Sequence, residues 1–428
     1  MSDQTHLTNF SSDKKAWPVY ITLGNLPSGR RNSPASMAVL LLALLPIPPK
    51  LSKSSKANVH QRQINADTLR DVFELIFAPL QDPARDGVPM DCADGKVRTC
   101  FPILAAWIAD HMENVTLHGI KSNVCPTCEV PTRELGSNRK VYPVRDYARY
   151  HHYDNENWLA ETDDNDITPQ SLGIRLGHNV FYELNRVSPP DLHKPDMLHT
   201  VYLGLFKHLM DWIQGFLKKH GRLEAFDEVW KALPPYPGFL VLKKAYREVT
   251  QWQGKEMRNL GRCILGILAV ALCQPRSAQL IPFKRALGCV RALVNFNMMA
   301  QYRSHTAETI TYMEDYLQTF HKKKDIFLEF RVSKRTRTKI DEQRRELRHD
   351  RAKTRERIAP SKRRRIRDAE KEEESERRMD LIYGESHFNF IKIHLLSHFC
   401  DHIRRFGNIP MYSTEFSELA HKTQIKDG

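Results

Sequence analysis

The chain has 428 residues, of which 41% are hydrophobic, so it is long enough for two domains or for one core with a large insertion. Its formal net charge of +14 suggests a polyanionic partner. The longest apolar run, residues 37–48, is broken by Pro46 and is too short to span a bilayer, so no membrane association is expected. Eight dispersed cysteines favour a reducing compartment over a disulfide scaffold.

The N-terminal part is expected to contain strands followed by a helix. Residues 17–23 are aromatic and β-branched, and residues 37–45 form the continuous apolar run that is typical of a strand covered on both faces. Residues 51–60 are rich in Ser and Lys and are interpreted as a linker. Residues 65–78 place apolar side chains at helical spacing and predict an amphipathic helix.

The second half of the sequence is mainly helical in pattern. Helical spacing dominates residues 197–330, a long charged segment follows, and residues 388–406 form a strongly amphipathic helix before a final helix from about Thr414. Strands, a helical block and then further helices predict an α/β core interrupted by an α-helical insertion.

Acidic residues stand at three element boundaries. Asp196 follows Pro195 and is expected to cap a buried helix, Asp3 precedes the strand region, and Glu415 and Glu418 open the last helix. Carboxylates that are far apart in sequence can converge to hold two hard divalent cations, which clamp the attacking and leaving oxygens of a phosphoryl transfer. On residue type alone, a helix cap and solvated carboxylates are the simpler interpretation.

Cys125-Pro126-Thr127-Cys128 has the spacing of a knuckle that binds tetrahedral Zn²⁺. Free thiols are the alternative, and a redox pair is less favoured because no thioredoxin-like βαβ unit surrounds it. Cys100 and His118 are the candidate third and fourth ligands. The wider set of candidates also includes Cys92, His151 and His152.

His394, His398 and His402 recur at every fourth residue on one face of the helix predicted over residues 388–406. That spacing is able to bind a metal, but the apolar neighbours favour histidines that line the core or an active site. A zinc-dependent hydrolase built on them lacks an HExxH-like base.

Most of the net charge lies in residues 331–367, which carry 17 Lys or Arg against 5 Asp or Glu. This density suits contact with a phosphate backbone or nuclear import, while a solvated helix with i,i+4 charge pairs is the alternative. Few aromatic residues are interleaved, so readout of bases is not indicated. The candidate DNA-binding residues are Lys334, Arg335, Arg337, Lys339, Lys362, Arg363, Arg364 and Arg365.

Several stretches occur together in a recognisable order. They are residues 2–5 with 17–27, residues 94–110 with the CxxC pair, residues 195–206, residues 394–399 with 406–408, and residues 413–422. In this order they resemble the blocks of Plavaka-type fungal transposases, which are relatives of the Kyakuja–Dileera–Zisupton and CACTA-type transposases. The resemblance covers nearly the whole chain and is specific because the blocks occur jointly.

The resemblance implies a ribonuclease-H-like mixed sheet core, interrupted by a large all-α insertion, that carries a DDE triad. Asp3 and Asp196 would be the two aspartates, and Glu418 the glutamate, with Glu415 as the close alternative. They would hold two Mg²⁺ or Mn²⁺ ions and act on DNA, both transposon ends and target, in the nucleus; a homo-oligomer is a further expectation. The expected domains are residues 1–50 (N-terminal strands of the core), 51–195 (remainder of the core with the CxxC region), 196–330 (helical insertion), 331–385 (basic, charged helical segment) and 386–428 (C-terminal helices that carry the glutamate).

The sequence departs from the family pattern at both ends. Only two residues precede Asp3, and the last residues fall inside the final helix. We therefore expect a copy truncated at both ends, with an incomplete first strand, that is inactive as it stands. The alternative function is a non-catalytic nucleic-acid-binding protein, derived from a transposable element, that keeps the fold and the basic segment.

Overall fold

The computed structural model describes residues 1–7, 14–31, 33–48, 55–138, 141–147, 173–174, 179–234, 236–237, 239, 246, 249, 252–273, 280–330 and 388–426. The strands are β1 (Thr5–His6), β2 (Lys15–Ala16), β3 (Pro18–Thr22), β4 (Val39–Leu44), β5 (Val88–Asp91) and β6 (Val97–Cys100). The helices of the first half are α1 (Ser28–Arg31), η1 (Pro34–Ser36), α2 (Ser55–Asp86), α3 (His111–Leu117), η2 (Thr132–Glu134), η4 (Val180–Tyr182) and α6 (Pro189–Leu192).

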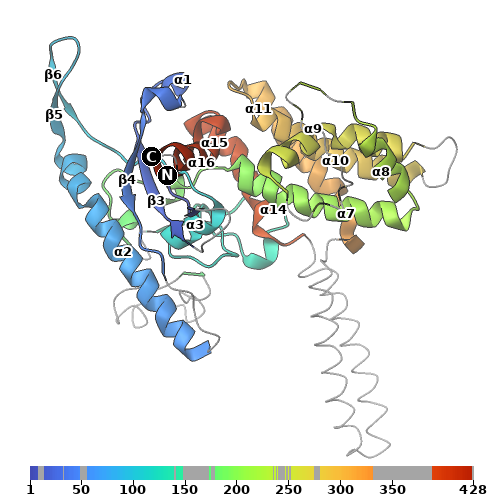
Figure 1. Ribbon diagram of the computed structural model, residues 1–428, viewed down its shortest axis with the longest axis horizontal. Coiled ribbons are helices and arrows are strands. Elements are labelled where there is room, and N and C mark those ends of the chain that lie inside the picture. Colours follow the sequence, from blue (N-terminus) through green and yellow to red (C-terminus); the bar gives the residue numbers. More distant parts are fainter. Residues whose placement is uncertain are drawn as a thin grey trace, which may run out of the picture.

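The helices of the second half begin with the π-helix η5 (Met197–Leu205) and continue through α7 (Phe206–Lys219), α8 (Leu223–Lys231), α9 (Gly254–Ala271), α10 (Leu280–Ala300), α11 (Ala307–Lys323) and η7 (Lys324–Phe330). The C-terminal part contains α14 (Ile391–Leu395), η8 (Leu396–His398), α15 (Phe399–Phe406), η9 (Ile409–Tyr412), α16 (Glu415–His421) and the π-helix η10 (Lys422–Lys426). Figure 1 shows the strands with α2, α3, α15 and α16 in one part of the molecule and α7 to α11 in the other, with α14 between them.

A short extended segment at Met1–Asp3 lies in the middle of the strand region. On one side its backbone exchanges hydrogen bonds with Tyr20 of β3, and β3 in turn pairs antiparallel with β4. On the other side the Ser2 N–H donates to the carbonyl of Ile108. Trp107, directly before Ile108, forms a parallel bridge with His193, so residues 192–193 lie next to residues 107–109. The backbone order is therefore β4, β3, residues 1–3, residues 107–109 and residues 192–193.

Helix α2 covers one face of this arrangement. Its apolar stripe, Leu69, Phe73 and Phe77, packs in one cluster with Val19 and Trp107. The helix predicted over residues 65–78 is confirmed, but it is longer than expected, and the linker interpretation of residues 51–60 is wrong from Ser55 onward. A Ser- and Lys-rich composition reports polarity rather than backbone conformation, and a helix of this length tolerates it in a terminal turn.

The opposite face is covered by the end of the chain. Tyr20 of β3, Met1 and Ile108 pack against Ala420 of α16. This cluster brings the C-terminal helix beside the first residues of the chain, as the neighbouring N and C marks show in Figure 1.

Strand β4 confirms the strand predicted over residues 37–45, but not the expected burial on both faces. Leu40, Leu41, Leu42 and Leu44 are all exposed. The reason is positional: within the described residues β4 pairs only with β3, so it lies at an edge that α2 and α16 cover in part.

The helical block forms its own core, as the spacing predicts. Side chains from η5 and α7 to α11 pack in one large cluster that also receives Ile393 and Phe399 from α14 and α15. The two largest buried side chains, Trp212 and Trp230, lie in it. The segment after the insertion is therefore anchored in the helical core at one end and beside β3 at the other. None of the described helices has the length and apolar character that a membrane crossing needs.

Candidate active site and metal centre

Asp196 lies directly ahead of η5, and its buried carboxylate is fully hydrogen-bonded. Oδ1 accepts from the N–H of Leu198 at 3.0 Å and from Thr414 Oγ1 at 2.9 Å. Oδ2 accepts from the N–H of His199 at 2.9 Å and lies 2.9 Å from Nδ1 of the same residue. The predicted capping role is therefore confirmed. Asp196 also fixes the His199 ring and, through Thr414, ties η5 to the start of α16.

The two glutamates of α16 face different partners. Glu418 turns toward His199, with Oε1 4.0 Å from Nε2 of the ring. Glu415 forms an ion pair with Arg258 of α9, in the helical block. Because the two side chains are three residues apart on a short helix, they occupy neighbouring positions with distinct environments.

Asp3 follows the extended N-terminal segment and is partly exposed. Its Oδ2 lies 3.6 Å from Nε2 of His421, on the same helix as Glu418. The Nδ1 atom of that histidine lies 2.9 Å from the Tyr20 hydroxyl. Asp3 is thereby placed beside α16.

Asp110 is a further carboxylate at this place, and the sequence analysis did not single it out as a candidate. It directly follows the buried residues 107–109, next to the backbone of Ser2, and it caps α3 by accepting from the N–H of Glu113 at 2.8 Å. The signal for it was available: an apolar run that ends in an aspartate just ahead of a helix. We call Asp3, Asp110, Asp196 and Glu418 the acidic site.

The charges of the aspartates act on Glu418 and on His199. Burial and the negative charges of Asp3 and Asp196 raise the pKa of Glu418, against the opposing effect of His199. Burial works against a charge on His199, but Asp196, together with Asp110 and Asp3, raises its pKa to about 9. A glutamate whose ionisation is opposed by neighbouring carboxylates has the donor chemistry of a site for hard divalent cations.

The acidic site is open rather than compact. Within the described part of the chain, one group of at least three His, Cys, Asp or Glu side chains has all its ligand atoms within 4.8 Å of one another. That group contains cysteines and histidines and no carboxylate. His199 contacts Asp196 and Glu418, and His421 lies beside Asp3.

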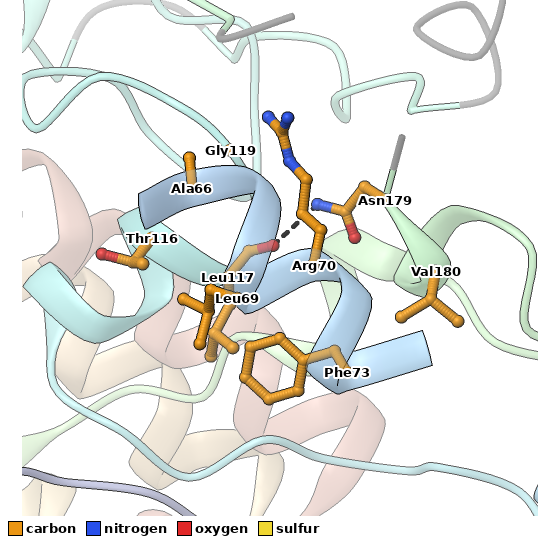
Figure 2. Close-up of a pocket in the computed structure, with 9 residues that line it drawn as sticks. All are labelled: Ala66, Leu69, Arg70, Phe73, Thr116, Leu117, Gly119, Asn179 and Val180. Carbon is orange, nitrogen blue, oxygen red and sulfur yellow. Dashed lines mark hydrogen bonds between the residues drawn. The ribbon is translucent and has the colours of Figure 1, made fainter. Parts of the chain in front are cut away.

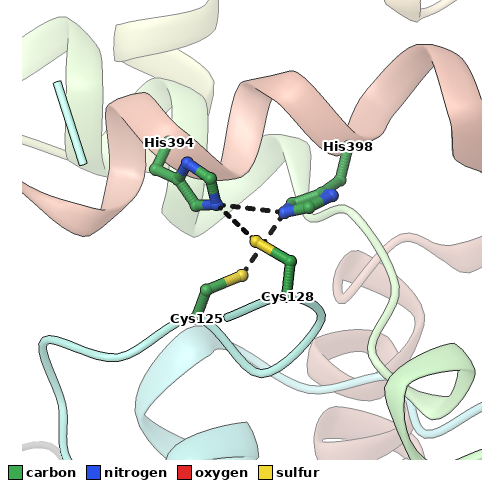
Figure 3. Close-up of side chains that lie close together, drawn as sticks. All are labelled: Cys125, Cys128, His394 and His398. Atoms are coloured by element: carbon green, nitrogen blue, oxygen red, sulfur yellow. Dashed lines mark hydrogen bonds between the residues drawn. The ribbon is translucent and has the colours of Figure 1, made fainter. Parts of the chain in front are cut away.

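That compact group is Cys125, Cys128, His394 and His398, which we call the Cys/His cluster (Figure 3). Cys125 Sγ lies 3.3 Å from His398 Nε2, and Cys128 Sγ lies 3.1 Å from His394 Nε2. The two Nε2 atoms are 3.2 Å apart. Tetrahedral zinc with two sulfur and two nitrogen ligands requires ligand atoms roughly 3.3–3.8 Å apart, given the usual Zn–S and Zn–N bond lengths. The four side chains fit such an ion.

The loop that carries the cysteines is held by neighbours that leave both sulfur atoms facing the histidines. The Arg145 guanidinium donates to the carbonyls of Cys125 at 2.9 Å and Cys128 at 3.2 Å, and the Tyr147 hydroxyl donates to the carbonyl of Pro126 at 2.8 Å. Burial opposes ionisation of the Cys125 thiol, yet Cys128 and the histidines lower its pKa well below the usual value. The same contact with Cys125, together with burial, raises the pKa of Cys128. The pair therefore favours one thiolate, at Cys125, and the thiolate is the form that binds metals.

A lysine connects the Cys/His cluster to the acidic site. Lys392, two residues before His394, donates from Nζ to the carbonyl of His199 at 2.9 Å. Gly204 of η5 leaves room for it, because a Cβ at that position would lie 2.4 Å from the lysine Cδ. The position of α14 therefore affects both sites.

Residues 1–213 match the family model of the Plavaka transposase. The chain belongs to the Plavaka transposase family. No curated protein matches it. Membership of a transposase family implies DNA binding and the use of a divalent metal, and it confirms the resemblance found in the sequence.

The match covers part of each site of this Plavaka-family chain. Asp3, Asp110 and Asp196 lie within residues 1–213, as do the two cysteines of the Cys/His cluster. The histidines of that cluster and Glu418 lie beyond the matched residues, so the match does not bear on them.

The zinc ligands expected for the Plavaka-family CxxC pair differ from those that the structure brings to it. Cys100 lies in β6 and His118 follows α3, and neither belongs to the Cys/His cluster. Of the three spaced histidines, two join the cysteines, whereas His402 packs its ring against Phe406 and Tyr412.

A small cavity between α2 and α3 in this chain is not a ligand site. It measures about 30 Å³ and is lined by residues such as Leu69, Phe73 and Val180 (Figure 2). Asn179 closes it by donating to the carbonyl of Leu117 at 2.7 Å. This volume holds one or two water molecules at most.

The DNA-binding residues predicted for this chain, between Lys334 and Arg365, lie outside the described residues. They remain a prediction from the sequence.

Proposed function

We propose that this chain is a DDE-type DNA transposase that cleaves and joins DNA strands with two divalent ions at the acidic site. The observation that supports this most is convergence in a chain of a transposase family: Asp196 and Glu418 lie within 4.0 Å of His199, and the charges of Asp110 and Asp3 act on the same ring. Mg²⁺ or Mn²⁺ bound there would activate the attacking oxygen and stabilise the leaving oxygen.

We assign the roles of the carboxylates from the number of hydrogen bonds that each one already accepts. Both oxygens of Asp196 already accept two hydrogen bonds each, so its role is to hold His199 and the start of α16. Within the described residues the Asp110 carboxylate accepts one bond, from Glu113. We therefore assign Asp3, Asp110 and Glu418 as metal ligands and Asp196 as a positioning residue. Glu415 is less suited, because Arg258 neutralises it.

A ribonuclease-H-like core is the fold that we propose for this site. Support comes from the backbone order, in which the antiparallel pair β4–β3 is followed by residues 1–3 and then by the two segments that precede Asp110 and Asp196. In such an order Asp3 and Asp110 emerge side by side from neighbouring segments.

The Cys/His cluster is proposed to hold structural Zn²⁺. All four protein ligands are present and three of them are buried, which is typical of structural rather than catalytic zinc. On the basis of the sequence and the family, the proposal includes three further points. The chain binds DNA through residues 331–367, acts in the nucleus and assembles as a homo-oligomer.

A divalent-ion titration tests the acidic site directly. Mn²⁺ at 100-fold above its Kd is expected to stabilise the fold by about 2.7 kcal/mol, seen as a rise in Tm. Asp3→Asn should remove this rise, whereas the exposed Asp82→Asn on α2 should keep it. The convergence of carboxylates supports activity rather than the inactive copy expected from the two ends of the sequence, so the protein should also nick or join DNA that carries the element's ends in the presence of Mn²⁺. Mn²⁺ binding without strand cleavage would instead support the inactive copy.

The competing function is metal-independent nucleic-acid binding by the basic segment. It predicts that DNA binding falls steeply with salt, disappears when residues 331–367 are deleted, and is accompanied by neither a Mn²⁺ shift nor strand cleavage. If all of these results are observed, the chain is a metal-independent nucleic-acid-binding protein and the transposase proposal is wrong.

A further inference from the structure

His421 is a buried histidine with one unbonded ring nitrogen. Its side chain lies between Tyr20 and Asp3, and its Nε2 atom has no hydrogen-bond partner within the described residues. An unsatisfied buried polar atom costs about 1–3 kcal/mol, so its retention asks for an explanation. The nearest charged atom is Oδ2 of Asp3, 3.6 Å away, just beyond hydrogen-bond length.

The contact with Tyr20 is compatible with a His421 tautomer that carries its hydrogen at Nε2. Burial, reinforced by the charge of Asp3, raises the pKa of the Tyr20 phenol, so the hydroxyl keeps its proton and is able to donate a hydrogen bond to Nδ1, 2.9 Å away. A neutral imidazole that accepts at Nδ1 carries its hydrogen at Nε2. In that tautomer Nε2 is a donor 3.6 Å from Asp3 Oδ2, and a shift of roughly 0.5 Å would complete a Tyr20–His421–Asp3 chain of hydrogen bonds.

The same chain joins the elements that bear two carboxylates of the acidic site. His421 is three residues after Glu418 on α16, so both side chains lie on one side of the helix. Tyr20 is fixed to the N-terminal segment by backbone hydrogen bonds to Met1. An imidazole between them therefore sets the position of the Asp3 carboxylate relative to Glu418.

We propose that His421 is a positioning residue that orients the Asp3 carboxylate for divalent-ion binding, with Tyr20 fixing its tautomer. The proposal rests on the proposed function, since it requires Asp3 to be a metal ligand. Carboxylate ligands of metals are usually held by such outer hydrogen bonds, whose removal typically weakens metal binding 10–100-fold.

A pair of variants of similar size separates positioning from packing. His421→Met fills the space without an N–H donor, whereas His421→Gln fills it with a side-chain N–H. On the full, zinc-loaded chain, with free Mn²⁺ measured by electron paramagnetic resonance, His421→Met should weaken Mn²⁺ binding about 10–100-fold and His421→Gln should restore most of it. Tyr20→Phe, which keeps the ring and removes the hydroxyl, should weaken binding to an intermediate degree.

A buried histidine elsewhere in the fold provides the matched control. His402 also has an unbonded Nε2 atom, but it packs against Phe406 and Tyr412. His402→Met should leave the Mn²⁺ affinity unchanged even if it lowers Tm. Because His421 acts through Asp3, the double variant Asp3→Asn/His421→Met should bind Mn²⁺ no more weakly than Asp3→Asn alone.

The outcomes distinguish this inference from the function on which it rests. If Asp3→Asn weakens Mn²⁺ binding but His421→Met and Tyr20→Phe do not, His421 is a packing residue and the inference is wrong. Equal losses for His421→Met and His421→Gln contradict it as well. If Asp3→Asn itself leaves Mn²⁺ binding unchanged, the proposed function fails first.

Discussion

Removal of the metal from the Cys/His cluster is expected to lower Tm by more than about 10 °C. Structural zinc contributes about 10–16 kcal/mol of apparent binding energy in small zinc domains, and part of that energy is lost with the ion. In this chain the ligands come from the Cys125–Cys128 loop and from α14 and η8, on either side of the helical block. Loss of the ion would therefore separate segments far apart in sequence.

The measurement combines metal content with thermal unfolding. Purified protein should carry one zinc per chain, and a strong chelator should remove it together with much of the thermal stability. Cys128→Ala and His394→Ala should each purify without zinc. Cobalt in place of zinc should give the visible absorption of a tetrahedral site with thiolate ligands.

The sequence candidates outside the cluster are the controls. Cys100→Ser and His402→Gln should keep one zinc per chain, because neither residue belongs to the cluster. If His402→Gln loses the metal while His394→Ala retains it, the ligand set is wrong. A wild-type protein that contains no zinc and ignores the chelator would exclude a structural metal.

The helical insertion was the most predictable part of the fold. The helical spacing over residues 197–330 corresponds to a series of helices that includes α10 and α11. These helices bury one stripe in a common core, so their sequence pattern reports their packing directly. The length of α2 and the exposure of β4 were not predictable, because they depend on which elements lie beside them.

The candidate site was predictable only in pieces. The CxxC spacing is local and was recognised, but its partner histidines are 266 and 273 residues away, and no local pattern links them. Their apolar neighbours indicated a buried helix, and that interpretation is compatible with metal ligation, because α14 packs in the helical core with Ile393 while His394 turns toward the cysteines. Asp196 and Asp110 each cap the helix that follows, and the sequence pattern alone does not distinguish a cap from a metal ligand.

Asp110→Asn and Asp196→Asn are expected to affect different properties: the first should weaken metal binding, and the second should lower the stability of the fold. At Asp110 an asparagine still caps α3, since Asn and Asp are equally good caps, so Tm should change little. The lost charge should weaken Mn²⁺ binding and lower strand cleavage by at least about 100-fold, the size typical of removing one electrostatic contact from a reacting centre.

At Asp196 the same change acts mainly on the structure. The new amide NH₂ replaces Oδ2 and faces the N–H of His199, so two donors meet where an acceptor stood. This should cost about 1–3 kcal/mol of stability. Strand cleavage should fall about 10–100-fold, because His199 loses its orientation while the metal ligands remain.

Unfolding curves, Mn²⁺ affinity and strand cleavage measured on both variants decide the assignment, with Asp82→Asn as the exposed control. The reverse pattern, with Asp196→Asn losing Mn²⁺ and Asp110→Asn retaining it, would make Asp196 the second metal ligand. Asp110 would then be a helix cap and nothing more, and the hydrogen bonds to Asp196 would have to rearrange when the ion binds. Four donors around one carboxylate make that rearrangement costly, and for this reason the geometry favours Asp110.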